Sequence, residues 1–362
     1  MDDLSFIPDA GLGWLDASGP HAEVVLSTRV RLARNLQGHC FGQRARPQDT
    51  RAVLERLAEA TQGAVPLLDR ASVLEIDRVE PRLRRVLQER RLISPHLLGG
   101  DEGPAAGAAV VLSAEEPFSI MLNEEDHLRV QAILSGLRLQ QAWSLVDRLD
   151  DQLGAVVPYA FHPEFGFLTS CPTNVGTGLR ASVLVHLPAL VLTKEIGKVL
   201  EGLGQVGLTF RGLYGEGSEV VGNFFQVSNQ TTLGQSEEEL VDHLERMIGQ
   251  VIQHELHARQ VLLRDAPQVT ADKLWRAYGL LRYARALSFE EMMNLMSGVR
   301  LGASLKLLPG LRVYTLNKIM IFTQAAHLEE AAGRELSAAE CDAHRAAYVR
   351  RALATEGVSE AE

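Results

Sequence analysis

Four stretches of this sequence carry arginines or carboxylates at points where predicted strands pass into loops. Each follows an apolar run that is typical of a strand, and catalytic groups are often mounted on loops of this kind. In the first stretch, Arg29 and Arg31 share one face of their strand, because side chains there repeat every second residue. The pattern predicts a catalytic or binding site at these loops. The stretches are residues 27–31, 123–129, 171–180 and 211–217.

The third stretch opens with a loop, CPTNVGTG at 171–178, that cannot continue the apolar runs on either side of it. Pro172 fixes φ and lacks a backbone donor, while Gly176 and Gly178 permit conformations closed to other residues. Such a loop can bring hydroxyls and bare backbone amides close to a ligand, and Arg180 follows at its exit. An ordinary turn between two strands is the alternative interpretation.

The motifs STRVR, NEEDHLR, CPTNVGTGLRA and RGLYGEGSE stand in this order along the chain. In that order they resemble the ATP:guanidino phosphotransferases, the family of the arginine and creatine kinases. The similarity is greater to the bacterial protein-arginine kinases, which ISPHL at 93–97 also resembles. The resemblance covers nearly the whole chain. It implies an α+β fold, with a catalytic domain over residues 1–265, an antiparallel sheet flanked by helices, and a helical C-terminal domain over residues 266–362.

The resemblance also implies an ATP site. No G-x-x-x-x-G-K-[ST] motif occurs, so arginine forks would hold the phosphates through bidentate hydrogen bonds. For any lone arginine, a surface or ion-pair role is the alternative. The family's phosphate-clamping arginines match Arg29, Arg31, Arg129, Arg180 and Arg211, and His96 matches a residue that contacts adenine. The other implied ATP contacts are Ser27, Thr28, Val30, Ala181, Ser182, Val183, Leu184, Gly212, Leu213, Tyr214, Gly215 and Glu216. Mg²⁺ is implied as a cofactor held by phosphate oxygens and water, without a protein metal site.

The implied reaction transfers the γ-phosphoryl group of ATP to arginine side chains of proteins. A guanidinium is charged in water and is no nucleophile until it loses a proton, so a carboxylate must orient it and accept that proton. Glu125 matches the catalytic base of the family, and Glu216 matches a second carboxylate of its arginine-directed members. Asp126 is expected to help bind the guanidinium. Glu124 is interpreted as an acidic residue at a helix N-terminus.

Cys171 matches the reactive cysteine of the family. With Thr173 and cationic groups nearby, its thiolate would lie against the substrate guanidinium and assist without forming a covalent intermediate. A small buried residue at a strand end is the alternative interpretation.

Composition limits the other classes of function. The chain has 362 residues, which suggests about two domains, and a net charge of −10, which gives no general attraction for nucleic acid. No run of about 18 apolar residues occurs, and the N-terminus lacks a basic region followed by an apolar one, so we expect neither a membrane span nor a secretory signal. Cys40, Cys171 and Cys341 are far apart, which predicts a reducing cytoplasm and neither disulfides nor a zinc site.

Apolar spacing and caps predict the remaining elements. We expect helices from Pro47, over 127–153 and over 189–203, and a strand over 223–228. Serines with a glutamate three residues later predict capping boxes at 236–239, 288–291 and 337–340, and the first opens a helix to about Arg264. Within that helix, His254-Glu255-Leu256-His257 lacks H-E-x-x-H spacing and is interpreted as a solvated face, not a zinc site.

One motif departs from the resemblance. Protein-arginine kinases carry R-D-x-x-R-A in the helical domain, forming a regulatory phosphoarginine pocket, and here Cys341 stands where the first arginine is expected. Asp342, Arg345 and Ala346 match, and Asp342 and Arg345 share a helix face. We therefore expect weak phosphoarginine binding and little activation. A plain amphipathic bundle helix is the alternative.

The resemblance further implies protein partners in the cytoplasm and no membrane. Family substrates include a stress-gene repressor and unfolded proteins destined for a Clp ATPase and its protease. A zinc-containing activator and a homodimer are also implied. A phosphagen kinase for free arginine is the alternative enzyme, but the short segment before STRVR and the extra helical domain argue against it. An inactive phosphoarginine-binding adaptor is the alternative from another class, and the intact charged motifs argue against it.

Overall fold

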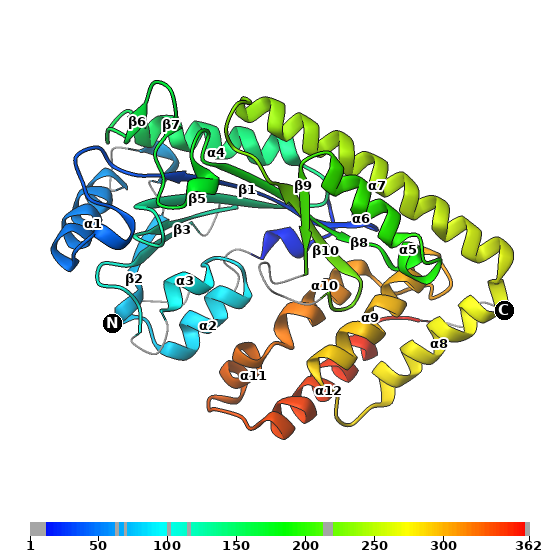
Figure 1. The fold of residues 1–362 in the computed structure, drawn as a ribbon. Helices are drawn as coiled ribbons and strands as arrows, with labels where there is room; N and C mark the ends of the chain where they lie inside the picture. The colour runs from blue at the N-terminus through cyan, green and yellow to red at the C-terminus, as the bar shows by residue number, and fades with distance from the viewer. Residues whose placement is uncertain are drawn as a thin grey trace.

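A computed structural model of the chain describes residues 12–61, 65–68, 71–99, 103–113, 117–212 and 220–358. In these residues one sheet has eight strands in the order β2-β3-β4-β5-β1-β8-β10-β9, with antiparallel neighbours throughout. This is the predicted α+β fold (Figure 1). The strands are β1 Val25–Arg34, β2 Ala71–Glu75, β3 Ala109–Ser113, β4 Phe118–Leu122, β5 Leu128–Ser135, β8 Leu179–His186, β9 Leu208–Arg211 and β10 Phe224–Asn229; β6 Phe161–His162 and β7 Gly166–Phe167 form a separate hairpin.

One face of the sheet is covered by a layer of helices. Alternate side chains of the central strands, such as Val30, Val130, Val183 and Val227, are fully buried in one core with α4 and α7. In Figure 1 these helices and α6 lie along the same side of the sheet. The helices of this part are α1 Pro47–Thr61, α2 Pro81–Glu89, α3 Pro95–Leu98, α4 Leu139–Gly154, α5 Pro188–Leu192, α6 Ile196–Gln205 and α7 Glu237–Asp265.

A helical bundle packs against part of the other face of the sheet, and the predicted arginines of β1, β5, β8 and β9 occupy another part of it. A second core joins Leu184 and Phe224 of the sheet to Met293 and Leu316 of the bundle. The bundle helices are α8 Pro267–Tyr283, α9 Phe289–Ser304, α10 Val313–Phe322, α11 Ala325–Ala332 and α12 Ala338–Ala354. The bundle also reaches α2 through ion pairs, among them Arg82–Glu330 and Arg85–Glu329, both 2.7 Å long. The bundle is therefore joined directly to α2 as well as to the sheet.

Two predicted helices are confirmed only in part: residues 139–153 of the first lie in α4, and most of the second is helical in α5 and α6. Residues 128–135, by contrast, form β5 at the centre of the sheet, where Leu128, Val130 and Ala132 enter the core and Arg129 and Gln131 point to the other face. The prediction extends the apolar spacing of α4 back across this strand. The predicted helix over 189–203 is divided into α5 and α6, because Lys194 adopts a left-handed φ of 63°. The capping boxes at Ser236 and Ser337 are present as predicted, whereas Ser288 makes only the bond from the Glu291 backbone.

Candidate active site

Five predicted arginines lie on the same face of the sheet although they come from four strands. Arg31 on β1 is directly opposite Arg180 on β8, and directly opposed residues of antiparallel strands share a face. Arg29 is two residues from Arg31, and Arg129 is two residues from the Gln131 that faces Arg31 on the other side. Arg211 on β9 is opposite Gln226, which extends the row to the edge strand. This face therefore concentrates positive charge.

The STRVR motif was expected at a strand end but lies inside β1, the central strand. It can remain in the sheet because β5 and β8 pair with it on both sides, satisfying its backbone, while its arginines face away from the helix layer. The predicted ATP contacts divide accordingly. Val30, Ala181 and Val183 are in the core beneath the helices, so only their backbone faces the charged side, whereas Ser182 lies with the arginines. Leu184 packs against the bundle.

The arginines of β1 are in an environment that disfavours isolated cations. Burial, followed by repulsion from Arg91, Arg129 and Arg180, lowers the pKa of Arg29 to about 9. Burial and repulsion from Arg29 and its neighbours bring the pKa of Arg31 well below its ordinary value. The Nε atoms of both are buried and have no hydrogen-bond partner among the described residues. An entering polyanion would supply both the missing charge and the missing acceptors.

The turn between β4 and β5 carries the carboxylates. Asn123 adopts a left-handed φ of 51° and fixes the turn by donating to the carbonyls of Thr50 and Gly107, at 2.8 and 2.9 Å. Arg129 Nη1 donates to both carboxylate oxygens of Glu124 at 2.7 Å, and Ser94 also donates to Glu124. The Glu124 side chain is 1% exposed. The interpretation of Glu124 as a helix N-terminal acid is therefore wrong, because it lies in a strand turn and orients Arg129.

The two glutamates of this turn differ in proton affinity. Burial alone would raise the pKa of Glu124, but Arg129 and Ser94 hold it below its ordinary value. Burial raises the pKa of Glu125, with help from Asp126 and Glu124 and against the attraction of Arg129. His96 lies near enough to lower the pKa of both glutamates. Glu125 is thus the better proton acceptor of the pair, as its predicted role requires.

Asp126 connects this turn to the Cys171 loop. Its buried Oδ1 accepts hydrogen bonds from Asn35 Nδ2 at 2.7 Å and from the Ser170 backbone at 2.6 Å. Ser170 Oγ donates to the Glu125 carbonyl at 2.8 Å. Cys171 follows directly, with its Sγ 3.0 Å from Thr173 Oγ1 as the sequence suggested. These contacts place Glu125 and Cys171 on adjoining segments, and the expected role of Asp126 in binding the guanidinium stays a prediction.

The glycines of the Cys171 loop are required by close packing. A Cβ on Gly176, which has a φ of 112°, would come within 2.2 Å of the Thr232 carbonyl oxygen. Thr232 Oγ1 in turn donates to the carbonyls of Thr173 and Val175, at 3.0 and 2.7 Å. The loop is therefore held against the segment that follows β10.

Four of the predicted site residues cannot be placed. Leu213, Tyr214, Gly215 and Glu216 lie outside the described residues, which stop at Gly212 after β9 and resume at 220. Ser27 and Thr28 are buried, and Thr28 Oγ1 donates to the Gly136 carbonyl at 2.7 Å.

Arg91 is a site residue that motif spacing misses. It is the first neighbour whose charge lowers the pKa of Arg29, and it follows α2 with a left-handed φ of 65°. Its carbonyl accepts from Gln131 Nε2 at 2.7 Å, beside the arginine row. Its position two residues before the ISPHL motif is the signal that could have found it.

The regulatory motif is brought together but turned inward. Arg345 donates to the Thr323 and Leu287 carbonyls at 3.0 and 2.7 Å and to Asp342 at 2.6 Å. Cys341, Arg345 and Ala346 are all buried. In this arrangement the guanidinium of Arg345 is hydrogen-bonded to groups within the bundle.

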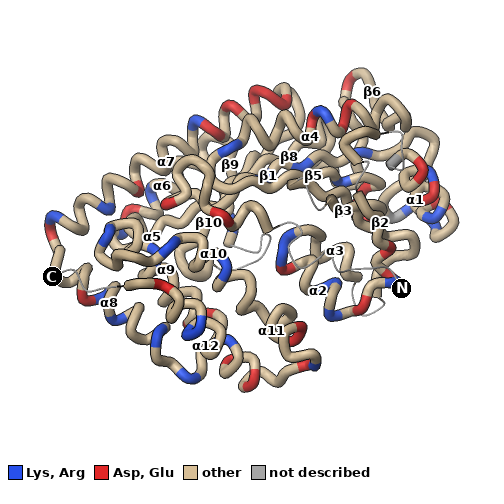
Figure 2. The backbone as a smooth tube through the Cα atoms, turned by 180° about the vertical axis from the view of Figure 1, so that it is seen from behind, with Lys and Arg blue, Asp and Glu red and all other residues tan. Residues whose placement is uncertain are grey.

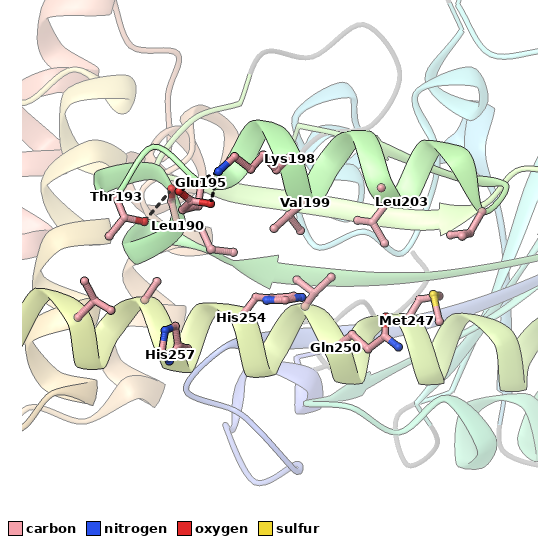
Figure 3. A pocket seen from close by; sticks show the side chains of 15 residues that line it. Leu190, Thr193, Glu195, Lys198, Val199, Leu203, Met247, Gln250, His254 and His257 are labelled. Carbon is pink, nitrogen blue, oxygen red and sulfur yellow. Dashed lines mark hydrogen bonds and ion pairs between the residues drawn. The ribbon is translucent and has the colours of Figure 1, made fainter.

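A groove of about 680 Å³ lies on the opposite side of the sheet, between α6 and α7 (Figure 3). Its apolar lining includes Val199, Leu203 and Met247. His254 and His257 border the groove and are exposed, as predicted for a solvated helix face. Among the described residues, no group of three or more His, Cys, Asp or Glu could hold a metal ion. Glu255 departs from that prediction. It is buried and bonds Arg259 and the backbone of α5.

Comparison with known proteins identifies the family that the chain resembles. Residues 52–258 match the model of the ATP:guanido phosphotransferase C-terminal catalytic domain, and residues 267–362 match that of the protein-arginine kinase McsB C-terminal domain. A protein-arginine kinase of Pelotomaculum thermopropionicum is 46% identical over 94% of this chain and 95% of its own. That of Bacillus subtilis is 41% identical over 97% and 96%. The lombricine kinase crystal structure superposes with a TM-score of 0.57 and 26% identity, covering 67% of this chain and 70% of its own.

Proposed function

The chain belongs to the ATP:guanidino phosphotransferase family and, within it, is a protein-arginine kinase, and from that premise we propose how its residues act. The γ-phosphoryl group of ATP is transferred to the guanidino group of an arginine side chain in a protein, so that an N–P bond forms, the bond to the β-phosphate oxygen breaks, and phosphoarginine, ADP and a proton are the products. The observation that carries this proposal is the arginine row across four strands beside a glutamate whose pKa is raised. Phosphoryl transfer requires this combination of clamped phosphates and a positioned base.

Binding of ATP would use the arginine row. The buried Nε atoms of Arg29 and Arg31 lack partners in the described structure, so a triphosphate would satisfy them and offset the repulsion that lowers their pKa values. Arg129, held by Glu124, would meet the phosphates from the β5 side, with Arg180 and Arg211 on the other side. His96, at the rim beside the glutamates, would contact the base. Mg²⁺ would arrive on the phosphates and neutralise part of their charge.

Activation of the acceptor would fall to the carboxylates. Glu125 would orient the substrate guanidinium by hydrogen bonds and accept the proton lost as the N–P bond forms. Asp126 would keep the Glu125 turn and the Cys171 loop together through Ser170. Cys171 would lie against the guanidinium, and Glu216 would supply a second carboxylate. The raised pKa of Glu125 supports its role because a more basic carboxylate accepts a proton more readily.

The wider role belongs to the same proposal and is supported by the resemblance of the motifs. The substrates would include a stress-gene repressor and unfolded proteins marked for a Clp ATPase, in the cytoplasm, with a zinc-containing activator and a homodimeric enzyme. Within the described residues no helix is long and apolar enough to cross a membrane.

One competition experiment tests the activity and its acceptor. The protein is incubated with ATP, Mg²⁺, an arginine-rich model protein and free arginine, and acid-labile phosphate is located by mass spectrometry and ³¹P NMR. We expect phosphate on arginine residues of the model protein. Phosphate on free arginine alone would assign a phosphagen kinase, and its absence from both acceptors would contradict the proposal.

A further inference from the structure

Four arginines gather at the end of the helical bundle that is formed by the last turns of α8 and α12. They border a pocket of about 420 Å³, here called the arginine pocket, whose lining is Arg282, Tyr283, Arg285, Ala347, Arg350, Arg351 and Ala354. Both helices carry basic residues in Figure 2. The lining contains no carboxylate, and in the part of the chain that the structure describes none of the four arginines forms an ion pair. In a chain with a net charge of −10, this is an unbalanced positive site.

Two of these arginines hold the pocket in shape. Arg350 Nη1 on α12 donates to the carbonyl of Ala284, which caps α8. Arg282 Nη1 on α8 donates back to the Arg350 carbonyl at 3.4 Å, and its Cζ lies 5.9 Å from the centroid of the Tyr283 ring. These bonds tie the two helices together and leave Arg285 and Arg351 exposed at the rim. The pocket is therefore built by the bundle and does not depend on a ligand for its form.

Helix capping explains only part of this charge. Basic residues stabilise helix C-termini, each of which carries about half a negative charge. Two helix ends thus supply about one negative charge against four arginines. The remaining positive charge is not matched by a carboxylate in the lining of the pocket.

The residue types indicate which anion. All four cations are arginines, whose planar forks bind phosphate oxygens in bidentate pairs, and several forks can share the three oxygens of one dianionic phosphoryl group. Tyr283 is 72% exposed and offers a ring face beside the forks, on which the aliphatic part of a side chain can pack. We propose that the arginine pocket binds the phosphoryl group of a phosphorylated protein side chain.

This site is separate from the Cys341–Ala346 motif on the same helix, whose Arg345 is buried and bonded within the bundle. It is also separate from the proposed transfer reaction. Binding in the arginine pocket is measured without turnover, so the failure of either proposal leaves the other to be judged by its own experiment.

Calorimetric titration of the full chain tests the proposal. A non-hydrolysable ATP analogue with Mg²⁺ first fills the nucleotide site. The probes are phosphoserine, phosphoarginine and inorganic phosphate, with serine and arginine as unphosphorylated controls. The test variant is Arg285→Gln/Arg351→Gln, which removes the two rim forks and leaves the bonds between the helices. The matched control is Arg246→Gln/Arg276→Gln, which removes two exposed arginines from other helix surfaces.

We expect at least one phosphorylated amino acid to bind the parent and the control equally, and to bind the test variant at least tenfold more weakly, since each lost charge-assisted contact costs about tenfold or more. Equal binding to the test variant would overturn the proposal. Inorganic phosphate binding as tightly as the phosphorylated amino acids would assign the pocket to the free anion and overturn the protein-borne ligand. No binding by the parent, with a lower Tm in the test variant, would leave helix capping as the sole role and also overturn it.

Discussion

Arginines occur in two opposite settings in this molecule, half-buried without a matching charge and fully buried with one. On the sheet face, Arg29 and Arg31 repel one another, and their buried Nε atoms have no partner among the described residues. Between α7 and the bundle, Arg259 donates to Glu255 at 2.8 Å, to Ser304 at 2.6 Å and to the Glu23 carbonyl at 3.3 Å. Its side chain is 3% exposed, and that of Glu255 is fully buried.

The two settings indicate two functions, ligand binding on the sheet face and a structural role between α7 and the bundle. Removing one partner of a buried ion pair leaves the other charge buried and uncompensated, which destabilises the fold. A buried charge that is unmatched lowers stability until a ligand arrives, so it persists where ligand binding requires it. We therefore interpret the sheet face as the phosphate site and the Arg259–Glu255 pair as a structural link.

The largest effect is expected when Glu125, the proposed base on the phosphate-binding face of the sheet, is replaced. Glu125→Gln retains the shape of the side chain but not its ability to accept a proton. We expect kcat to fall about a hundredfold or more, as for loss of a general base, with ATP affinity and the free energy of unfolding nearly unchanged. Full activity of this variant in the phosphorylation assay would exclude Glu125 as the base.

The structural pair should respond in the opposite way. Arg259→Met leaves the Glu255 carboxyl buried without its cation, and we expect the free energy of unfolding to fall by about 3 kcal/mol. The folded fraction should bind ATP with unchanged affinity. Denaturant unfolding and nucleotide titration measure the two quantities, and Lys198→Met, an exposed ion-pair partner, is the matched control. A loss of ATP affinity without a loss of stability would refute the comparison.

A smaller effect concerns pH. Because the pKa of Glu125 is raised, this carboxyl becomes protonated at a higher pH than an ordinary glutamate, and the protonated form cannot accept a proton. We expect kcat/KM to decline in acid with an apparent pKa above the ordinary glutamate value of 4.5. A rate profile whose acid limb lies below 4.5 would contradict this environment for Glu125.

The sequence predicts the participants of the site more securely than their placement. The order of the motifs singles out Arg31, Arg129 and Arg180 in the sequence. In the structure the pairing of β1 with β5 and β8 brings these three arginines onto one face of the sheet. The motif order does not reveal that STRVR lies inside the central strand, since that depends on which strands pair with it. Residues 128–132 alternate between apolar and polar as a strand does, but this short pattern is followed within a few residues by the apolar spacing of α4, so the sequence alone predicts one helix across both.

Long-range partners also escape the sequence. Glu124 belongs to an acidic run, and only the turn geometry directs it to Arg129 and Ser94. Arg345 occupies its motif position, but the carbonyls that bind it come from the chain near Thr323 and Leu287. Arg91 has no motif, and its proximity to Arg29 follows from the packing of α2.

If Arg29 and Arg31 on the sheet face are retained for phosphate binding, the Arg31→Gln substitution will weaken ATP binding without destabilising the fold. ATP binding and denaturant unfolding are measured on the same preparation, beside Arg259→Met. We predict at least a tenfold loss of ATP affinity, about the value of one charge-assisted contact, with a free energy of unfolding that is unchanged or higher because a repelled cation is gone. Unchanged ATP affinity with reduced stability would contradict this role and show that Arg31 is a structural residue.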